Sequence, residues 1–120
     1  MKKILVADDL PKIVELIRVT LEDKDYKIIN ASNGKETLRK ARKEQPNVIL
    51  LDVVMPKMDG FEVCRQLKKD PLTKEIPIIM LTAKGQEVDK QRGKEVGAND
   101  YIIKPFSPST LSIKVKEILA

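Results

Sequence analysis

The sequence contains no histidine, no tryptophan and only one cysteine, Cys64, in 120 residues. A single cysteine excludes a disulfide framework within the chain, and without histidine it has no partner for a catalytic cysteine–histidine pair. We therefore interpret Cys64 as a buried core residue and expect a reducing compartment, the cytoplasm. No apolar run approaches the ~20 residues that a membrane span requires, so no membrane partner is expected.

Aromatic residues are scarce, and charge of one sign is not gathered in one region. The chain has two tyrosines, two phenylalanines and a net charge of +5, and only residues 35–43 are locally basic. A nucleic-acid surface needs clustered cations together with aromatic side chains. The composition instead predicts a solvated, lysine-rich surface and no direct contact with nucleic acid. The length suits one domain, which we expect to span residues 1–120 with no second domain.

Strand-like and helix-like apolar patterns alternate along the chain. Short runs of β-branched residues predict strands, and apolar residues spaced by three and four predict helices. Alternation with short connections predicts an α/β fold in which helices cover both faces of a five-stranded parallel sheet. The predicted strands are residues 3–7, 26–31, 47–51, 78–81 and 100–103. The predicted helices are residues 10–23, 36–43, 61–68 and 86–95, with a last helix capped by Ser107 or Ser109.

Polar side chains follow the predicted strands where these strands end. Asp8 and Asp9 follow the first strand, Asp52 the third, Thr82 the fourth and Lys104 the fifth. The carboxyl ends of parallel strands share one edge of the sheet, where ligands of such folds bind. If the first and third strands are neighbours, about 5 Å apart, three carboxylates meet and require a compensating cation. Mg²⁺ suits such oxygen ligands, and we expect it here, with Mn²⁺ able to substitute.

This combination of groups is suited to one reaction. A carboxylate beside Mg²⁺, a lysine and a hydroxyl can attack phosphorus and form an aspartyl phosphate. Taken singly, each group has a structural explanation: the acid pair as a helix cap, Thr82 as a strand-end hydroxyl and Lys104 as a solvated cation. Their combined spacing is what favours a functional site.

The motifs together resemble the receiver domain of two-component response regulators, over the whole chain. They are Asp8-Asp9, the sequence Asp-Val-Val-Met-Pro at residues 52–56, Asp59-Gly60, Leu81-Thr82-Ala83, Gly-Ala-Asn-Asp-Tyr at residues 97–101 and Lys-Pro-Phe at residues 104–106. The resemblance implies a flavodoxin-like, doubly wound fold with strand order 2-1-3-4-5.

The resemblance also implies a role for each acid. Asp52 would be the phosphoacceptor, phosphorylated by a sensor histidine kinase. Asp9 and Asp52 would bind Mg²⁺ directly, Asp8 largely through water, and the backbone carbonyl of Val54 would be a further ligand. Because the Val54 side chain cannot hold a water, slow autodephosphorylation is expected. Lys84 lies at a second position where relatives tune hydrolysis.

On the other side of the expected site, the resemblance implies a switch. Lys104 would pair with the phosphoryl group, and the peptide bond from Lys104 to Pro105 would be cis. Thr82 would move to donate a hydrogen bond to the phosphoryl group, and Tyr101 would turn inward behind it. These movements would act on the fourth helix, the poorest in apolar residues, and expose a surface for a downstream protein target.

We therefore expect a phosphoacceptor that catalyses only its own phosphorylation and dephosphorylation. Two alternatives stay open: the receiver part of a longer DNA-binding regulator, and a Mg²⁺-dependent phosphohydrolase that works through an aspartyl phosphate. A substrate-binding insertion for a hydrolase does not fit in 120 residues. A flavodoxin-like flavin carrier is disfavoured, because Asp8 and Asp9 would repel the phosphate of the flavin.

Overall fold

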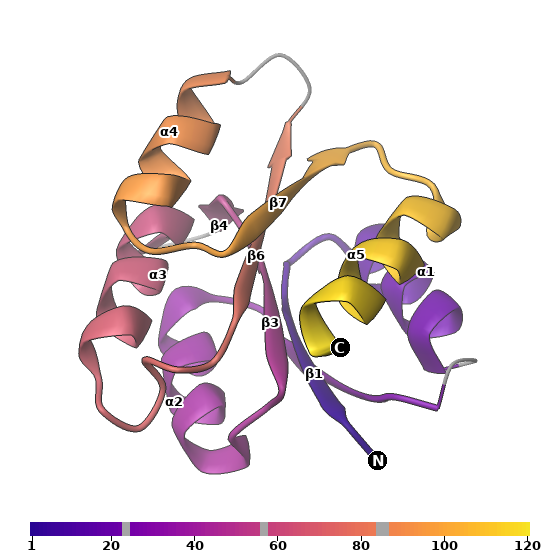
Figure 1. Cartoon of the computed structure of the whole chain (residues 1–120), viewed down its shortest axis with the longest axis horizontal. Coiled ribbons are helices and arrows are strands. Elements are labelled where there is room, and N and C mark those ends of the chain that lie inside the picture. The colour runs from indigo at the N-terminus through magenta and orange to yellow at the C-terminus, as the bar shows by residue number, and fades with distance from the viewer. Residues whose placement is uncertain (23–24, 56–57, 84–86) are drawn as a thin grey trace.

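The computed structural model describes residues 1–22, 25–55, 58–83 and 87–120. Five parallel strands form one sheet in the order β2-β1-β3-β6-β7 (Figure 1). This is the predicted 2-1-3-4-5 order, and the predicted fold class is confirmed. The strands are β1 (Lys3–Ala7), β2 (Lys27–Ala31), β3 (Val48–Asp52), β6 (Ile78–Ala83) and β7 (Asp100–Lys104).

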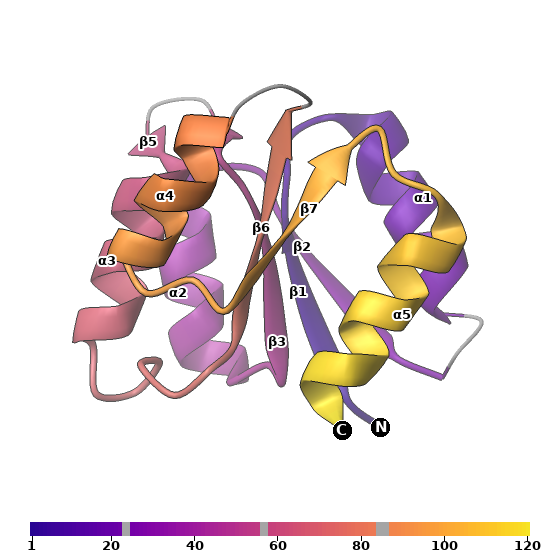
Figure 2. The ribbon, with the colours of Figure 1, turned by 45° about the horizontal axis from the view of Figure 1, so that its top comes forward.

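Helices cover both faces of the sheet (Figure 2). On one face lie α1 (Pro11–Glu22) and α5 (Pro108–Leu119), and their buried residues Ile17, Leu21, Leu111 and Val115 share a core with every second residue of the central strands. On the other face lie α2 (Gly34–Glu44), α3 (Gly60–Lys69) and α4 (Glu87–Glu95). Within the described ranges, no helix is long and apolar enough to cross a bilayer.

The core confirms the interpretation of the cysteine and agrees with a sheet covered on both faces. All five residues of β3 are buried, as expected for a strand covered on both faces. Cys64 is fully buried in the core beneath α2 and α3. Burial raises the pKa of its thiol to about 11.

Side-chain caps explain where three of the helices begin. Asn33 accepts a hydrogen bond from the Glu36 amide at 2.9 Å and starts α2. Asp59 caps α3, accepting a hydrogen bond from the Phe61 amide at 2.7 Å. Of the two serines considered for the last helix, Ser107 is the cap. Most predicted boundaries agree within one or two residues.

Two short strands that the sequence pattern did not predict follow β3. Strands β4 (Val54–Met55) and β5 (Met58–Asp59) pair antiparallel, with Val54 opposite Asp59. Two residues are too few to show an alternating pattern. Their pairing holds the chain after Asp52 close to the start of α3.

Candidate functional site

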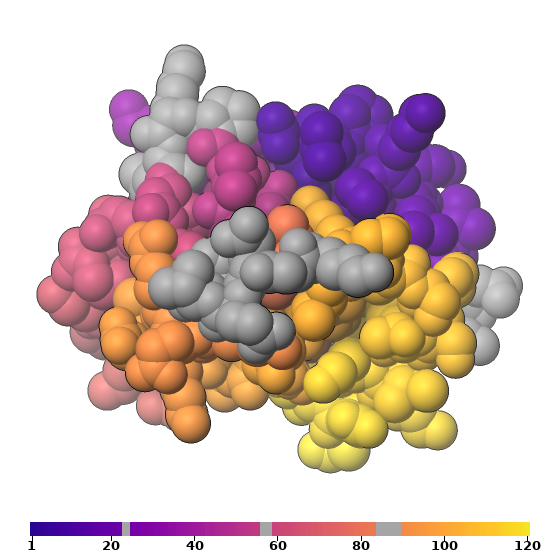
Figure 3. All heavy atoms as spheres, turned by 90° about the horizontal axis from the view of Figure 1, so that it is seen from above, coloured from indigo at the N-terminus to yellow at the C-terminus, as the bar shows by residue number. Residues whose placement is uncertain are grey.

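Three aspartates meet at the carboxyl edge of the sheet. Strands β1 and β3 are neighbours, so Asp8 follows β1 where Asp52 ends β3. Asp8 and Asp52 are buried, with 1% and 5% of their surface exposed, and Asp9 is exposed. One carboxylate oxygen from each of the three lies within 4.8 Å of the others. In Figure 3, which views the molecule from this end, the N-terminal (indigo), middle (magenta) and C-terminal (yellow-orange) parts of the chain lie side by side.

Lys104 lies between the two buried acids. It ends β7, and its ammonium group reaches past β6 to lie 2.8 Å from Oδ2 of Asp8 and 3.3 Å from Oδ2 of Asp52. The peptide bond from Lys104 to Pro105 is cis, as the resemblance implied. Placement of Lys104 at this edge was predicted, but its pairing with Asp8 was not.

Backbone amides orient the two buried carboxylates. Oδ1 of Asp8 accepts a hydrogen bond from the Leu10 amide at 2.9 Å, and Oδ1 of Asp52 accepts one from the Val54 amide at 3.2 Å. Burial raises the pKa of the Asp52 carboxyl above its ordinary value, and the nearby charge of Asp8 adds to this. The amide of Val54 and the ammonium of Lys104 act in the opposite direction without cancelling it.

The donor set fits a hard divalent cation. Three carboxylates that converge from adjacent strand ends offer oxygen ligands on one side and leave the exposed Asp9 side open to water. Mg²⁺ is typically held by one or two carboxylates plus waters and phosphate oxygens. Val54, whose amide donates to Asp52, is 73% exposed. The expected ligand role of its carbonyl stays a prediction, as do the roles of the three acids.

Thr82 and Tyr101 lie on the neighbouring strands, and only Thr82 is buried. Thr82 sits in β6 one residue past Leu81, which pairs with Asp52, and 2% of its surface is exposed. Tyr101 in β7 is 37% exposed. Its ring lies between two ammonium groups, that of Lys90 at 4.7 Å and that of Lys114 at 5.9 Å from the ring centroid.

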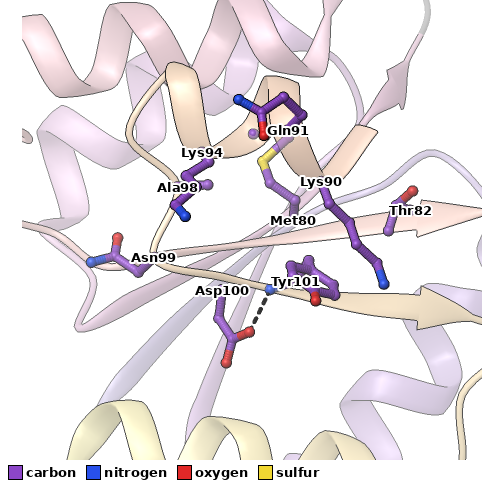
Figure 4. A pocket seen from close by; sticks show the side chains of 10 residues that line it. Met80, Thr82, Lys90, Gln91, Lys94, Ala98, Asn99, Asp100 and Tyr101 are labelled. Atoms are coloured by element: carbon purple, nitrogen blue, oxygen red, sulfur yellow. Dashed lines mark hydrogen bonds between the residues drawn. The ribbon is translucent and has the colours of Figure 1, made fainter. Parts of the chain in front are cut away.

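A pocket of about 480 Å³ separates α4 from β7 (Figure 4). Met80 and Thr82 line it from β6, Tyr101 from β7, and Lys90 from α4. In Figure 4 the Lys90 side chain extends from α4 down to the Tyr101 ring. The two expected switch residues therefore border one pocket, which no pattern in the sequence predicts.

One contact near the site was missed because no local pattern reveals it. Asp59, which caps α3, also pairs with Arg92 of α4 at 3.2 Å. The two residues lie 33 positions apart and neither belongs to an apolar repeat. Lys84, the other position expected to tune hydrolysis, lies outside the described residues.

The family model of the response regulator receiver domain matches residues 4–116. The chain belongs to this family. Among the relatives of this receiver domain is the alkaline phosphatase synthesis transcriptional regulatory protein PhoP of Bacillus subtilis, which is 52% identical over 118 residues. That match covers 98% of this chain and 48% of PhoP, so the chain spans about half the length of the curated relatives it matches.

Solved receiver structures are similar over nearly the full chain. The chemotaxis response regulator CheY4 of Vibrio cholerae has a TM-score of 0.93 and 39% identity, with 99% of each chain covered. The receiver domain of the sensor histidine kinase PA1611 from Pseudomonas aeruginosa has a TM-score of 0.90 and 27% identity, with 98% of this chain and 97% of that chain covered. Its structure has a magnesium ion coordinated in the active-site cleft.

Family membership gives the aspartate cluster a context. Receiver domains take phosphoryl groups from histidine kinases and bind Mg²⁺ at an acidic site. In this receiver domain the cluster of Asp8, Asp9 and Asp52 is the one candidate acidic metal site found in the described part of the chain.

Proposed function

We propose that Asp52 accepts a phosphoryl group from a sensor histidine kinase in a Mg²⁺-dependent reaction, and that this changes the surface offered to a downstream partner. The observation that carries the proposal is the buried Asp52 carboxylate, held beside Asp8 and Lys104 at the ligand-binding edge of the sheet. Receiver domains are generally not enzymes in the ordinary sense, and turnover here would be limited to the chain's own phosphoryl group.

The first step is a nucleophilic substitution at phosphorus. A carboxylate oxygen of Asp52 forms the new phosphorus–oxygen bond while the phosphorus–nitrogen bond of the kinase phosphohistidine breaks, and the nitrogen keeps that electron pair. Oδ1 of Asp52 is held by the Val54 amide, which fixes the direction of the carboxylate. Asp8, Asp9 and Asp52 would hold Mg²⁺, which when bound neutralises charge on the phosphoryl oxygens.

Lys104 would then exchange partners. In this structure its ammonium group serves Asp8 and Asp52, and a phosphoryl group on Asp52 would present three strong acceptor oxygens to it. Thr82 would donate a hydrogen bond to the same phosphoryl group, because it follows Leu81, which pairs with Asp52 in the sheet. The pocket beside Thr82 gives the Tyr101 ring space to turn inward, away from Lys90 and Lys114.

Intact-mass measurement after incubation with acetyl phosphate and Mg²⁺ tests this proposal. The wild-type chain should gain one phosphoryl group, and Asp52→Asn should gain none. Removal of Mg²⁺ with EDTA should abolish the gain, and Asp9→Asn should slow it strongly. A phosphoryl group on Asp52→Asn, or none on the wild type with Mg²⁺ present, would refute the assignment.

The length of PhoP favours a second candidate for what this receiver domain controls. PhoP, a transcriptional regulatory protein, is about twice as long as the matched region. In this alternative the receiver domain controls a DNA-binding part of the same polypeptide, rather than a separate protein. Reading the gene beyond the codon for Ala120 decides between the two, because an open frame encoding a DNA-binding domain is expected only in the second. In either case we expect the protein in the cytoplasm, where histidine kinases phosphorylate their partners.

A further inference from the structure

Arg92 of α4 contacts the start of α3 in two ways. Its Nη2 lies 3.2 Å from Oδ2 of Asp59, and its guanidinium carbon lies 4.2 Å from the centroid of the Phe61 ring. The other oxygen of Asp59 accepts the Phe61 amide at 2.7 Å. Both oxygens of Asp59 are therefore engaged, one within α3 and one with α4.

Asp59 is in turn tied to the backbone that follows Asp52. It lies opposite Val54 in the antiparallel pairing of β5 with β4. The next residue, Gly60, donates its amide to the Val53 carbonyl at 3.0 Å. A methyl group on Gly60 would lie 2.2 Å from the Asp52 carbonyl oxygen, so these two backbone segments are in direct contact. In a close-packed arrangement of this kind, displacement of Asp59 displaces Val54.

Little of helix α4 is buried in the part whose side chains the structure describes, residues 90–95. Among its residues with described burial, only Gly93 is buried, and a glycine has no side chain to insert into the core. Within residues 90–95, surface contacts such as the one that Arg92 makes therefore help to position α4.

We propose that Arg92 is a positioning residue for the metal-binding edge. By holding Asp59, it keeps β4 and the Val54 backbone in the arrangement that a cation at the aspartate cluster requires. The same contact links cation binding to the position of α4, separately from Thr82 and Tyr101. The proposal rests on the proposed function in one respect, the binding of Mg²⁺ to Asp8, Asp9 and Asp52.

The expected effect is modest, because both side chains are about half exposed, 51% for Arg92 and 48% for Asp59. Ion pairs of this kind contribute up to about 1 kcal/mol, and the contact with the Phe61 ring adds to it. Substituting Arg92→Met, which keeps an apolar stem over Phe61, should weaken Mg²⁺ binding roughly two- to fivefold, the ratio that corresponds to this energy.

The direction of this change separates positioning from simple electrostatics. Loss of a positive charge near a cation site should by itself strengthen Mg²⁺ binding. The proposal predicts the opposite, weaker binding in Arg92→Met, measured by isothermal titration calorimetry. The matched control is Arg65→Met, which removes an arginine that pairs with Glu62 on the surface of α3. It should leave the Mg²⁺ dissociation constant unchanged or slightly lower.

Asp59→Asn provides the second arm, because an asparagine oxygen can still cap α3 while the ion pair is lost. It should weaken Mg²⁺ binding to a similar degree. Because both substitutions remove the same contact, the double variant should bind Mg²⁺ about as tightly as either single variant. In NMR spectra, the α4 amides of residues 90–94 should shift on Mg²⁺ saturation in the wild type and shift less in Arg92→Met.

The outcomes distinguish the two proposals. A wild-type chain that binds no Mg²⁺ would overturn the proposed function. Tight binding by the wild type with equal dissociation constants for Arg92→Met and Arg65→Met would overturn the positioning role and leave the proposed function standing. Thermal unfolding of each variant confirms that the comparison is made between folded proteins.

Discussion

The ammonium nitrogen of Lys104 lies 2.8 Å from Oδ2 of Asp8 and so joins the end of the last strand to the end of the first. The Asp8 side chain is fully buried and that of Lys104 is 17% exposed. An ionised carboxylate in such a place needs a cation beside it. The lysine expected to recognise a phosphoryl group therefore also stabilises the domain before any phosphoryl group arrives.

Replacing this lysine should cost stability that Mg²⁺ can restore. Lys104→Met leaves Asp8 and Asp52 without their cation and should lower the free energy of unfolding by about 3 kcal/mol in EDTA. Saturating Mg²⁺ should raise the melting temperature of the variant more than that of the wild type. Lys114→Met, which breaks a partly exposed pair with Asp100, is the control and should cost less than about 1 kcal/mol. Equal losses in the two variants would contradict the special position of Lys104.

The raised pKa of Asp52 predicts how stability depends on pH in the absence of metal. A carboxyl that is harder to ionise in the folded state than in the unfolded state binds more protons when folded. The free energy of unfolding therefore falls as the pH rises from 3.8, the ordinary pKa, through the raised pKa of the folded state. Below pH 3.8 this loss is absent, because the carboxyl is protonated in both states. In EDTA, Asp52→Asn should be more stable than the wild type at pH 7, and the difference should shrink toward pH 4. Urea unfolding at several pH values measures it; a difference independent of pH would contradict this account.

The sheet and the aspartate cluster could be predicted from the sequence because both follow from general rules. Apolar runs locate the strands, and parallel strands bring their carboxyl ends to one edge, so Asp8 and Asp52 had to meet once β1 and β3 were neighbours. Lys104 and Thr82 reach the same edge for the same reason. The order of the strands itself came from the resemblance to receiver domains.

Other features could not be predicted, since they depend on individual side-chain contacts. Strands β4 and β5 are two residues long, too short for any periodic signal. The sequence places Tyr101 on a strand but does not say that its ring lies between Lys90 and Lys114. The pairing of Arg92 with Asp59 depends on how α4 packs against α3, which no repeat in α4 reveals.

Two glycines should respond in opposite ways to substitution by alanine. At Gly60 an added methyl group would lie 2.2 Å from the Asp52 carbonyl oxygen and 2.7 Å from Cα of Val53, both backbone atoms that cannot move aside alone. Gly60→Ala should cost about 3 kcal/mol and weaken Mg²⁺ binding. At Gly93, inside α4, the nearest atoms are side-chain atoms at 3.5 Å or more. Gly93→Ala should stabilise the domain by about 0.5–1 kcal/mol. Thermal unfolding measures both, and destabilisation by Gly93→Ala would contradict the packing described for α4.

The exposed residue Val54, whose amide donates to Asp52, predicts a long-lived phosphoryl group. Valine has no polar atom with which to hold a water molecule near the phosphorus, and 73% of its surface is exposed. Val54→Asn supplies an amide that can orient water, so the phosphoryl group on Asp52 should be lost several-fold faster, as followed by intact mass after removal of acetyl phosphate. A wild-type lifetime of seconds that this substitution leaves unchanged would count against the prediction.

The buried thiol of Cys64 should be protected from alkylation until the domain unfolds. Burial raises its pKa from 9.0 to about 11, and the neighbouring ammonium of Lys68 offsets this only in part. The thiolate is the reactive form, so at pH 8 reaction with iodoacetamide should be at least about a hundredfold slower than in guanidinium-unfolded protein, as two pKa units imply. Native alkylation at the unfolded rate would show that the core beneath α2 and α3 opens readily.

The same pKa difference makes stability depend on pH. Because the thiol ionises at lower pH in the unfolded chain, the free energy of unfolding should fall as pH rises from 9 toward 11, and Cys64→Ala should lack this fall.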